Sequence, residues 1–307
     1  MAGGNYMLTT TTNISNAKLI THAGLFHADD VLATVILKKV FGNLSVCRTF
    51  KVPENGISDD AIVYDIGFGK YDHHQKGGNG SRENGVPYAA VGLIWKDFGP
   101  KLVANTCNPN FVWTLIDRDL IQGVDAIDNG KMPKADYPAQ VMSFSQTISV
   151  FNPNWDSNMS ADEAFIKAVE FAEIVFNNVF EHAVSKAKAQ SIVDKTIDYA
   201  EEHIMVLEQF VPWQEFLFTS ESDKADDIQF VVFPSDRGGF NWQCVPDELG
   251  GFGQRKSVPT EWKGLRDLEL QEVTDVKTAT FCHPAGFIGG AETLEDAIAL
   301  ARIAVES

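Results

Sequence analysis

The alternation of short apolar runs with amphipathic stretches is the feature that most constrains the fold of this chain. Residues 17–21, 44–50 and 61–65 are short apolar runs typical of buried strands, whereas apolar residues recur at helical spacing over 28–42 and again over 87–99. Strands that alternate with helices predict a parallel sheet with right-handed crossovers. We therefore expect an α/β domain with helices on both faces of a parallel sheet.

The rest of the chain predicts a long helix followed by a smaller domain. A helix is expected over 110–128 and an irregular stretch from there to residue 155, after which the pattern is helical over 160–203. That stretch is longer than an ordinary globular helix, so we interpret it as a strut, broken or continuous, that joins two domains. The remainder predicts an α+β domain, with strands over 204–207, 228–233 and 240–245 and a final helix over 294–305.

These elements divide the chain into four parts. Residues 1–16, rich in Thr and Asn, are expected to be disordered, and residues 17–160 form the first domain. A helical connector over 161–203 leads to the second domain over 204–307.

Imidazoles and carboxylates gather where the strands of the first domain would end. They are His22, His27 and Asp29 after the first strand, Asp65 at the end of a later one, and the triplet Asp72-His73-His74. In a parallel sheet the carboxyl ends of the strands form one rim, where ligands bind. Imidazole and carboxylate suit divalent ions, and a set rich in acids suits two ions better than one. The sequence predicts a metal centre, completed by Asp125 or Asp128 on the predicted helix 110–128.

Composition limits the classes of partner. Twenty-five basic against 42 acidic residues leave a formal net charge of −17, which repels long nucleic acids and anionic membranes over most of the surface. Bound metal ions can make the net charge of an acidic pocket positive, so the acidic composition does not exclude a phosphate substrate. The four cysteines show no C-x-x-C spacing, and neither a signal peptide nor a membrane-length apolar run is evident. We therefore expect a cytoplasmic protein without a membrane partner.

Several motifs carry a resemblance to a known family. They are His-Ala-Gly-Leu-Phe-His-Ala-Asp-Asp over 22–30, Val-Tyr-Asp-Ile-Gly over 63–67, Tyr-Asp-His-His-Gln over 71–75, Val-Asp-Ala-Ile-Asp-Asn-Gly over 124–130, Gly-Leu-Arg-Asp over 264–267 and Phe-Cys-His-Pro-Ala-Gly-Phe-Ile-Gly-Gly over 281–290. The acid-His-His triplet resembles the signature of the DHH phosphoesterase superfamily, and the motifs together resemble the Myg (melanocyte proliferating gene) family of metal-dependent exonucleases. The likeness spans nearly the whole chain and implies a DHH-type phosphoesterase domain over 17–160 and a substrate-binding domain over 204–307.

The resemblance implies a set of metal ligands. Most superfamily members begin with His, three residues, Asp, one residue and Asp, whereas here His27 is the middle ligand after a gap of four residues, as in the Myg family. The implied ligands are His22, His27 and Asp65 for one ion and Asp29, Asp65, His73 and Asp128 for the other. Asp128 is preferred because Asp128-Asn-Gly resembles the Asp-Thr-Gly of related phosphoesterases, with Asp125 as the alternative. We expect two Mn²⁺ ions, with Mg²⁺ as the alternative metal.

The expected reaction is hydrolysis of a phosphoester. Two divalent ions about 3.5–4 Å apart can hold one hydroxide between them as the nucleophile. We expect His74 and Asp72 to act in catalysis, with Asp72 orienting an imidazole, while Gln75 and Lys76 contact the charged substrate. Resemblance to the domain that accompanies DHH modules implies that the second domain holds the terminal nucleotide, through Arg255, Arg266, His283 and a glycine-rich turn that includes Gly289 and Gly290. A purely structural turn is the alternative for the glycines. Trp242 and Trp262 could stack a base, but a core position is favoured.

The leading hypothesis is a metal-dependent phosphodiesterase that acts as a 3'-5' exonuclease on short single-stranded RNA or DNA. One alternative is a phosphatase or pyrophosphatase acting on small phosphate compounds, and another is a non-catalytic metal-binding regulatory protein. A zinc peptidase is disfavoured because the sequence has no His-Glu-x-x-His motif. The oligomeric state is open, and a homo-oligomer is compatible with the sequence.

Overall fold

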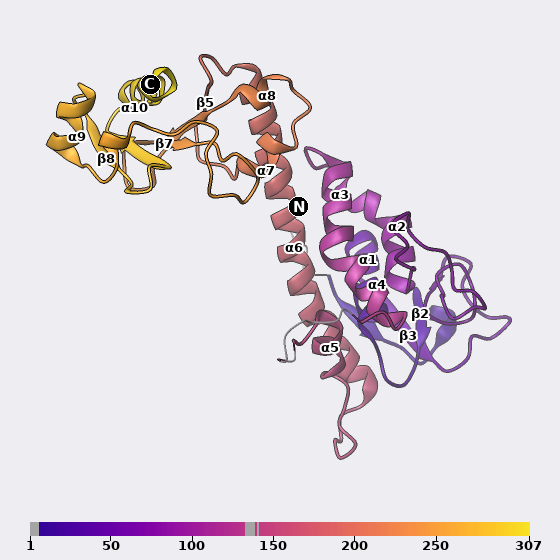
Figure 1. The fold of residues 1–307 in the computed structure, drawn as a ribbon. Coiled ribbons are helices and arrows are strands. Elements are labelled where there is room, and N and C mark those ends of the chain that lie inside the picture. The colour runs from indigo at the N-terminus through magenta and orange to yellow at the C-terminus, as the bar shows by residue number, and fades with distance from the viewer. Residues whose placement is uncertain (1–5, 133–138, 140) are drawn as a thin grey trace. The chain divides into compact units, whose positions relative to one another are not determined.

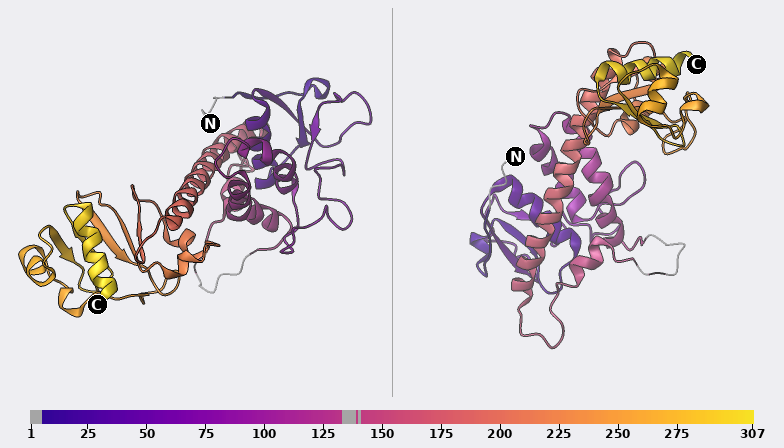
Figure 2. Two further views of the ribbon diagram at one scale, coloured as in Figure 1. Left: turned by 90° about the horizontal axis from the view of Figure 1, so that it is seen from above. Right: turned by 90° about the vertical axis from the view of Figure 1, so that its left-hand side faces the viewer.

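The computed structural model describes residues 6–132, 139 and 141–307, and the chain divides into two compact units, Met1–Val184 and Ser185–Ser307 (Figure 1). Within the expected connector over 161–203, one continuous helix, α6 (Ala161–Asp198), appears as a single rod in both views of Figure 2 and ends five residues before the predicted end. The boundary between the units falls within this helix, so each unit contains part of it.

The first unit contains a parallel sheet, which confirms the expected α/β class. Its four strands lie in the order β1-β3-β2-β4. They are β1 (Leu8–Thr10), β2 (Leu19–His22), β3 (Leu44–Thr49) and β4 (Ile62–Val63). In the central pair, β2 and β3, Ile20 lies opposite Cys47 and His22 opposite Thr49. This register places His22 at the carboxyl edge of the sheet, where the sequence predicts the site.

The prediction that residues 1–16 are disordered is wrong for β1 and for the short 3-10 helix η1 (Ile14–Asn16). Strand β1 pairs in parallel with β3, with Leu8 opposite Leu44. A short Thr-rich run has little apolar pattern of its own, but it suits an edge strand, and β3 is the one strand that pairs with β1 in the described part of the chain. Residues 1–5 of the same prediction lie outside the described residues.

Five further α-helices and a π-helix belong to the described part of the first unit, besides the first part of α6. They are α1 (Ala28–Phe41), α2 (Ala90–Val103), α3 (Pro109–Ile116), the π-helix η2 (Asp117–Ile121), α4 (Gln122–Asp128) and α5 (Phe144–Ser149). The helix predicted over 110–128 therefore contains a π-helical segment. Helix α5 lies within the stretch expected to be irregular, of which residues 133–138 and 140 are outside the described residues.

Helix α1 is the central element of the first unit, because its residues 28–38 are all buried. It begins at Ala28 and ends at Phe41, as the sequence predicts, since Gly42 has a φ of 86° that favours glycine and stops the helix. Asp29 and Asp30 occupy its first turn, where the helix dipole favours negative charge. The N-terminus of α1 thus faces the edge of the sheet with two buried carboxylates.

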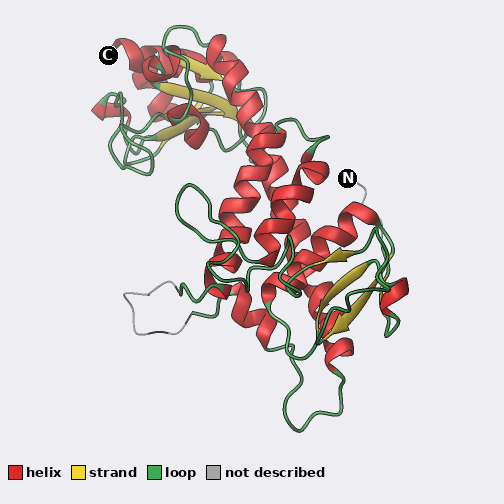
Figure 3. Ribbon diagram, turned by 90° about the vertical axis from the view of Figure 1, so that its right-hand side faces the viewer, coloured by secondary structure: helices red, strands yellow, loops and turns green. Residues whose placement is uncertain are grey.

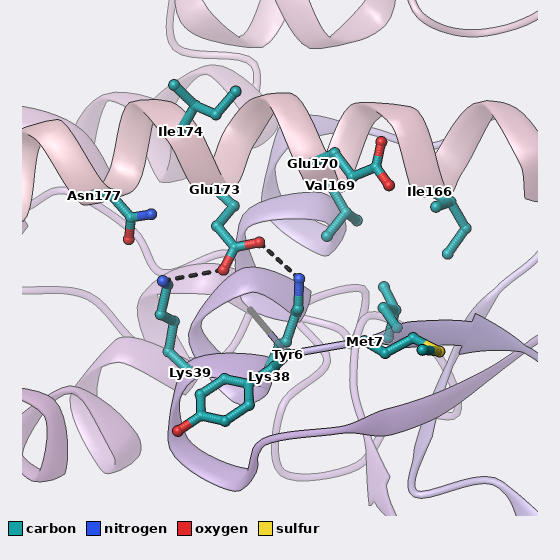
Figure 4. Close-up of a pocket in the computed structure, with 11 residues that line it drawn as sticks. Tyr6, Met7, Lys38, Lys39, Ile166, Val169, Glu170, Glu173, Ile174 and Asn177 are labelled. Carbon is teal, nitrogen blue, oxygen red and sulfur yellow. Dashed lines mark hydrogen bonds and ion pairs between the residues drawn. The ribbon is translucent and has the colours of Figure 1, made fainter. Parts of the chain in front are cut away.

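Helix α6 packs against the other end of α1 through a pair of lysines. Glu173 of α6 accepts a hydrogen bond from Lys38 at 2.6 Å and lies 3.0 Å from the Nζ of Lys39. Figure 4 shows the Glu173 carboxylate between the two ammonium groups, on the wall of a cavity of about 500 Å³ that Tyr6 and other residues line. All three charged side chains are largely buried, so the contact is more than a surface ion pair.

The second unit is built on a mixed sheet, which confirms the expected α+β character (Figure 3). Its five strands lie in the order β5-β6-β7-β9-β8, with β5 parallel to β6 and the other pairs antiparallel. They are β5 (Ile204–Val206), β6 (Phe230–Pro234), β7 (Phe240–Cys244), β8 (Ala279–Cys282) and β9 (Ile288–Ala291). The helices are α7 (Gln214–Phe218), α8 (Lys224–Asp227), the 3-10 helix η3 (Thr260–Trp262), α9 (Asp267–Thr274) and α10 (Leu294–Glu306).

Two tryptophans lie in the core of the second unit. Trp242 and Trp262 are fully or almost fully buried and meet edge to face, with ring centroids 6.3 Å apart. They are thus core residues, as the sequence favoured, and they do not offer a stacking surface to a base. Across the described residues, no helix has both the length and the apolar character that crossing a membrane would require.

Candidate metal centre

A tight turn between β2 and α1 brings the first three predicted ligands together. His22 ends β2, Gly24 turns the chain with a φ of 85°, and His27 is the N-cap of α1. The backbone N–H of His27 donates to Asp30 Oδ1 at 2.9 Å, which fixes the start of the helix. The two imidazole rings lie with centroids 5.7 Å apart, and Asp29 follows on the first turn of the helix.

Asp65 lies between the histidines of the two loops. Its Oδ2 is 3.2 Å from His22 Nε2, and its Oδ1 is 3.9 Å from His73 Nε2. Asp65 also has a left-handed backbone with a φ of 55°, a conformation that costs free energy for a residue with a side chain. Such local strain is characteristic of functional sites, where the surrounding structure imposes it.

Asp72 organises the loop that carries the triplet. Its carboxylate accepts hydrogen bonds from the backbone N–H groups of Phe68 at 2.6 Å and His74 at 3.0 Å, and its Oδ1 lies 2.8 Å from His74 Nδ1. Burial opposes ionisation of Asp72, but these hydrogen bonds outweigh it and lower its pKa. Asp72 therefore orients the half-exposed ring of His74, while His73 is buried.

Asp128 and Asp125, the two candidates on the later helix, lie in different surroundings. Asp128 Oδ2 is 3.1 Å from His73 Nε2, and its Oδ1 is 4.0 Å from His27 Nδ1. Asp125 Oδ1 instead accepts hydrogen bonds from two backbone N–H groups at the start of α2, and its Oδ2 lies 2.8 Å from Arg82 Nη1. These contacts favour Asp128 as the ligand and give Asp125 a structural role.

The side chains of this cluster fit divalent ions. Four overlapping groups have ligand atoms within 4.8 Å of one another: His22, His27 and Asp65; Asp65, His73 and His74; His27, Asp29 and Asp128; and Asp29, Asp30 and Asp65. Asp29 and Asp65 are almost completely buried; among the described residues the oxygens of Asp29 have no hydrogen-bond partner, and those of Asp65 meet only the imidazoles of His22, His73 and His74. Burying carboxylates without partners is costly, and cations bound between them would remove that cost.

Electrostatics in the cluster follow from the crowding of acids. Burial and the nearby carboxylates of Asp65, Asp128 and Asp30 raise the pKa of Asp29. Burial also raises the pKa of Asp30, to about 7. Burial lowers the pKa of His22, but Asp65 and Asp30 outweigh it and raise that pKa to about 9. Each carboxylate charge therefore disfavours ionisation of its neighbours in this site.

Asp30 is a member of the cluster that the sequence analysis did not single out. It is completely buried, and its Oδ2 lies 3.3 Å from His22 Nε2. The sequence signal that could have identified Asp30 is its position three residues after His27, where an acidic side chain can complete a capping box. Asp30 thus holds both histidines of the first loop in place.

Comparison with known proteins assigns the chain to a family. The model of a family described as "Uncharacterised protein family (UPF0160)" matches residues 18–305. This chain belongs to that family. It is 32% identical to a MYG1 protein of Schizosaccharomyces pombe over 94% of this chain and 97% of the relative. It is 30% identical to proteins named MYG1 exonuclease from Mus musculus and Homo sapiens, over 92% of this chain and 83% and 84% of those relatives. No solved structure is similar enough to count as a match.

In this member of the MYG1 family, the two polar residues after the triplet differ in what they contact. The Gln75 side-chain amide donates to the carbonyls of Gly69 at 3.1 Å and Asp72 at 2.8 Å, so it holds the triplet loop together. Lys76 is exposed on the same loop. Lys76 is therefore the freer of the two to meet a substrate, although the role of each is still a prediction.

The predicted substrate-binding residues of the second unit lie in several environments. Arg255 Nη1 donates to the carbonyls of Ala225 and Ile228 at 2.6 and 3.0 Å, which favours a structural role. Arg266 is exposed at the N-cap of α9, and the exposed His283 accepts a hydrogen bond at Nδ1 from a nearby backbone N–H. Their roles in binding stay predictions.

The prediction that Gly289 and Gly290 form a turn is wrong. Both lie within β9, which pairs with β7 on one side and β8 on the other. A Cβ on Gly289 would overlap the Trp242 indole and the carbonyl of Phe281. Glycine is required here because the neighbouring strands pack too closely for a side chain. The local sequence does not reveal this requirement, since the neighbours come from other strands.

Proposed function

We propose that this chain is a metal-dependent phosphodiesterase that acts as a 3'-5' exonuclease on short single-stranded RNA or DNA in the cytoplasm. The observation that carries the proposal is the convergence of the buried carboxylates of Asp29 and Asp65 with imidazoles from two loops. Relatives named MYG1 exonuclease support a nuclease rather than another metal-dependent enzyme.

Residues of the first unit would hold the ions. His22, His27 and Asp65 form one ligand set, and Asp29, Asp65, His73 and Asp128 form the other, with Asp65 shared. Mn²⁺ or Mg²⁺ in these positions would lower the pKa of bound water and neutralise the negative charge of the phosphodiester. Asp30 keeps the His22 and His27 loop fixed by binding the N–H of His27.

We assign to His74 the contact with the substrate itself. Because its Nδ1 lies 2.8 Å from the Asp72 carboxylate, Nδ1 carries a proton and the ring is held with Nε2 free to face the substrate. A protonated His74 would donate from Nε2 to a phosphoryl oxygen or to the leaving oxygen. Asp72 is the positioning residue in this pair.

Net charge favours short substrates. The formal charge of −17 repels a long polyanion, whereas an oligonucleotide of about two to ten residues needs to meet only the local site. Small phosphate compounds are the competing substrate class, because the same ligands could bind them.

The proposal is tested with a short RNA labelled at its 5' end and incubated with Mn²⁺. Wild type is expected to produce a ladder of stepwise shortened labelled products, whereas His73→Ala and Asp128→Asn lose about 100-fold or more of the rate. Asp59→Asn, a change at an exposed carboxylate, is the matched control and should behave as wild type. Immediate release of a labelled mononucleotide would show that cleavage starts at the 5' end and not at the 3' end. If the oligonucleotide stays intact and phosphate is released from pyrophosphate, the substrates are small phosphate compounds and not oligonucleotides.

A further inference from the structure

A cavity of about 810 Å³ opens directly on the candidate metal centre. One part of its wall consists of centre residues: His22, His27, Asp65, Asp72 and His74. The rest is mainly apolar and comprises Leu25, Phe50, Lys51, Val52, Pro53, Ile66, Gly67 and Phe68. A mostly apolar cavity with a few polar groups at one end is typical of a site for an organic ligand, and this volume lies within the usual range.

Two aromatic side chains of this wall are exposed to an unusual degree. Phe50 is 84% exposed and Phe68 is 70% exposed. Single exposed apolar residues are common, but two phenylalanines and Leu25, which is 66% exposed, line the same cavity beside the centre. Apolar side chains that gather around a polar site indicate a ligand that covers them.

Phe50 is held against the loop that carries the first ligands. It directly follows β3, and a Cβ built on Gly24 would lie 3.4 Å from Phe50 Cε1. Gly24 lies between His22 and His27, so the ring of Phe50 rests on the turn that positions both histidines. Gly24, which has no Cβ, therefore leaves room for this ring beside the turn.

Phe68 is tied to the other side of the centre through Asp72. Its backbone has a φ of 56°, which is unfavourable for a bulky residue, and its N–H donates to Asp72 Oδ2 at 2.6 Å. The same carboxylate orients His74. The hydrogen bond therefore fixes the backbone of Phe68, which carries an exposed aromatic ring, relative to the triplet.

We propose that Phe50 and Phe68 form a stacking surface for the base of the nucleotide whose phosphodiester bond is cleaved. The inference rests on the proposed function and deepens it, because it places the scissile phosphate at the metal centre and the adjoining base in the apolar part of the same cavity. It replaces the expectation from the sequence that residues of the second unit hold the terminal nucleotide. Lys51 lies in the same wall and adds a positive charge for a flanking phosphate. Stacking on an aromatic ring accepts every base, which suits an exonuclease without sequence preference.

Inorganic pyrophosphate has no surface that would cover Phe50 and Phe68. A nucleobase has an aromatic face for each ring, and such stacking changes binding of a base by about five- to a hundredfold. The aromatic pair therefore favours nucleotide substrates over purely inorganic ones.

The test uses two short oligonucleotides that differ only in the terminal nucleotide that wild type removes, which carries either a base or an abasic analogue. Wild type should cleave the base-bearing substrate with a kcat/KM about five- to a hundredfold higher, mainly through KM. Phe50→Ala and Phe68→Gly should lower this ratio to nearly one and leave cleavage of the abasic substrate unchanged. Phe50→Trp should retain the preference, since tryptophan also stacks.

Controls separate stacking from loss of the fold. Glycine readily adopts the left-handed backbone at position 68, so Phe68→Gly should keep a melting temperature at or above that of wild type. Tyr199→Ala removes an aromatic side chain that is 83% exposed in the second unit and should keep the preference for a base.

Three results would overturn the inference. Equal cleavage of both substrates by wild type would exclude base stacking while leaving the nuclease function intact. Equal losses on both substrates in the Phe50 and Phe68 variants would assign these residues a structural role. Absence of metal-dependent cleavage of either substrate by wild type would overturn the proposed function and the inference with it.

Discussion

Arg82 and Asp125 form a buried ion pair in which Nη1 lies 2.8 Å from Oδ2. The guanidinium also donates to Asp117 through Nε and Nη2, at 2.8 and 2.6 Å. Oδ1 of Asp125 in turn accepts hydrogen bonds from the backbone N–H groups of Ala89 and Gly92. Asp125 therefore joins α4 to the N-terminus of α2, whereas Asp128, one turn further along α4, lies beside the imidazoles of the candidate centre.

This difference predicts opposite results for two similar substitutions. Asp128→Asn should lower the Mn²⁺-dependent rate by about 100-fold or more and leave the melting temperature of the metal-free protein nearly unchanged. Asp125→Asn should lower the free energy of unfolding by about 2–3 kcal/mol, because Arg82 loses one of its two buried charge partners. Chemical denaturation and oligonucleotide cleavage measure the two effects. Loss of metal binding in Asp125→Asn with normal stability would reverse the assignment.

The close packing of Asp125 also predicts the effect of two Gly→Ala changes in helices. A Cβ on Gly92 of α2 would overlap the Asp125 carboxylate and the Tyr88 ring, whereas a Cβ on Gly123 of α4 would meet nothing within 4 Å. Gly92→Ala should therefore destabilise the protein by about 1–3 kcal/mol. Gly123→Ala should stabilise it by up to about 1 kcal/mol, because alanine favours the helix. Equal effects in urea denaturation would show that Asp125 can move aside.

Local sequence patterns were sufficient to predict those helices and strands whose own residues carry the signal. Helix α1 starts and ends where its apolar spacing and Gly42 predict, and β2 and β3 follow from short apolar runs. Strand β1 could not be predicted because a Leu-Thr-Thr run becomes a strand only by pairing with β3, a partner distant in sequence. The same reason applies to Gly289, whose packing against Trp242 brings together two strands.

The candidate site was predictable as a set of residues but not as an arrangement. Strand ends and motifs pointed to the imidazoles and carboxylates that the structure brings within a few ångströms of one another. The motif resemblance preferred Asp128 but left Asp125 as the alternative, because both lie on one helix and the contact that distinguishes them comes from Arg82 in a distant loop. Phe50 and Phe68 gave no local signal, since a phenylalanine is usually buried and only the structure reveals their exposure.

The buried carboxylate of Asp29 is expected to destabilise the metal-free protein and to strengthen metal binding. Asp29 is completely buried, and both of its oxygens lack a hydrogen-bond partner among the described residues. Mn²⁺ added to chelator-treated wild type should raise the melting temperature, with a gain of about 2.7 kcal/mol at a concentration of 100 times Kd. Asp29→Asn should be more stable than wild type without metal, because it removes like-charge repulsion, and should show a much smaller response to Mn²⁺. An unchanged Mn²⁺ response in this variant would exclude Asp29 as a ligand.

The contact of Glu173 with Lys38 and Lys39 predicts a stability difference that depends on pH. Burial alone would raise the pKa of Glu173, but the hydrogen bonds from the two lysines outweigh it, so the pKa falls below its ordinary value of 4.5. A lowered pKa in the folded state means that the contact contributes fully above the unfolded value of about 4.5. That contribution is lost as the pH falls through the lower pKa of the folded protein.

Glu173→Gln should therefore lower the free energy of unfolding by about 1–2 kcal/mol at pH 7, since it leaves two largely buried lysines without a counter-charge. The difference from wild type should shrink towards zero in acid, because protonated Glu173 is then as neutral as glutamine. Glu170, one turn earlier on α6 and exposed (Figure 4), provides the matched control, and Glu170→Gln should stay within about 0.5 kcal/mol of wild type at every pH. Urea denaturation between pH 3 and pH 7 measures both. A Glu173→Gln effect of the same size at both ends of that range would mean that packing, and not the charge of Glu173, stabilises the contact between α1 and α6.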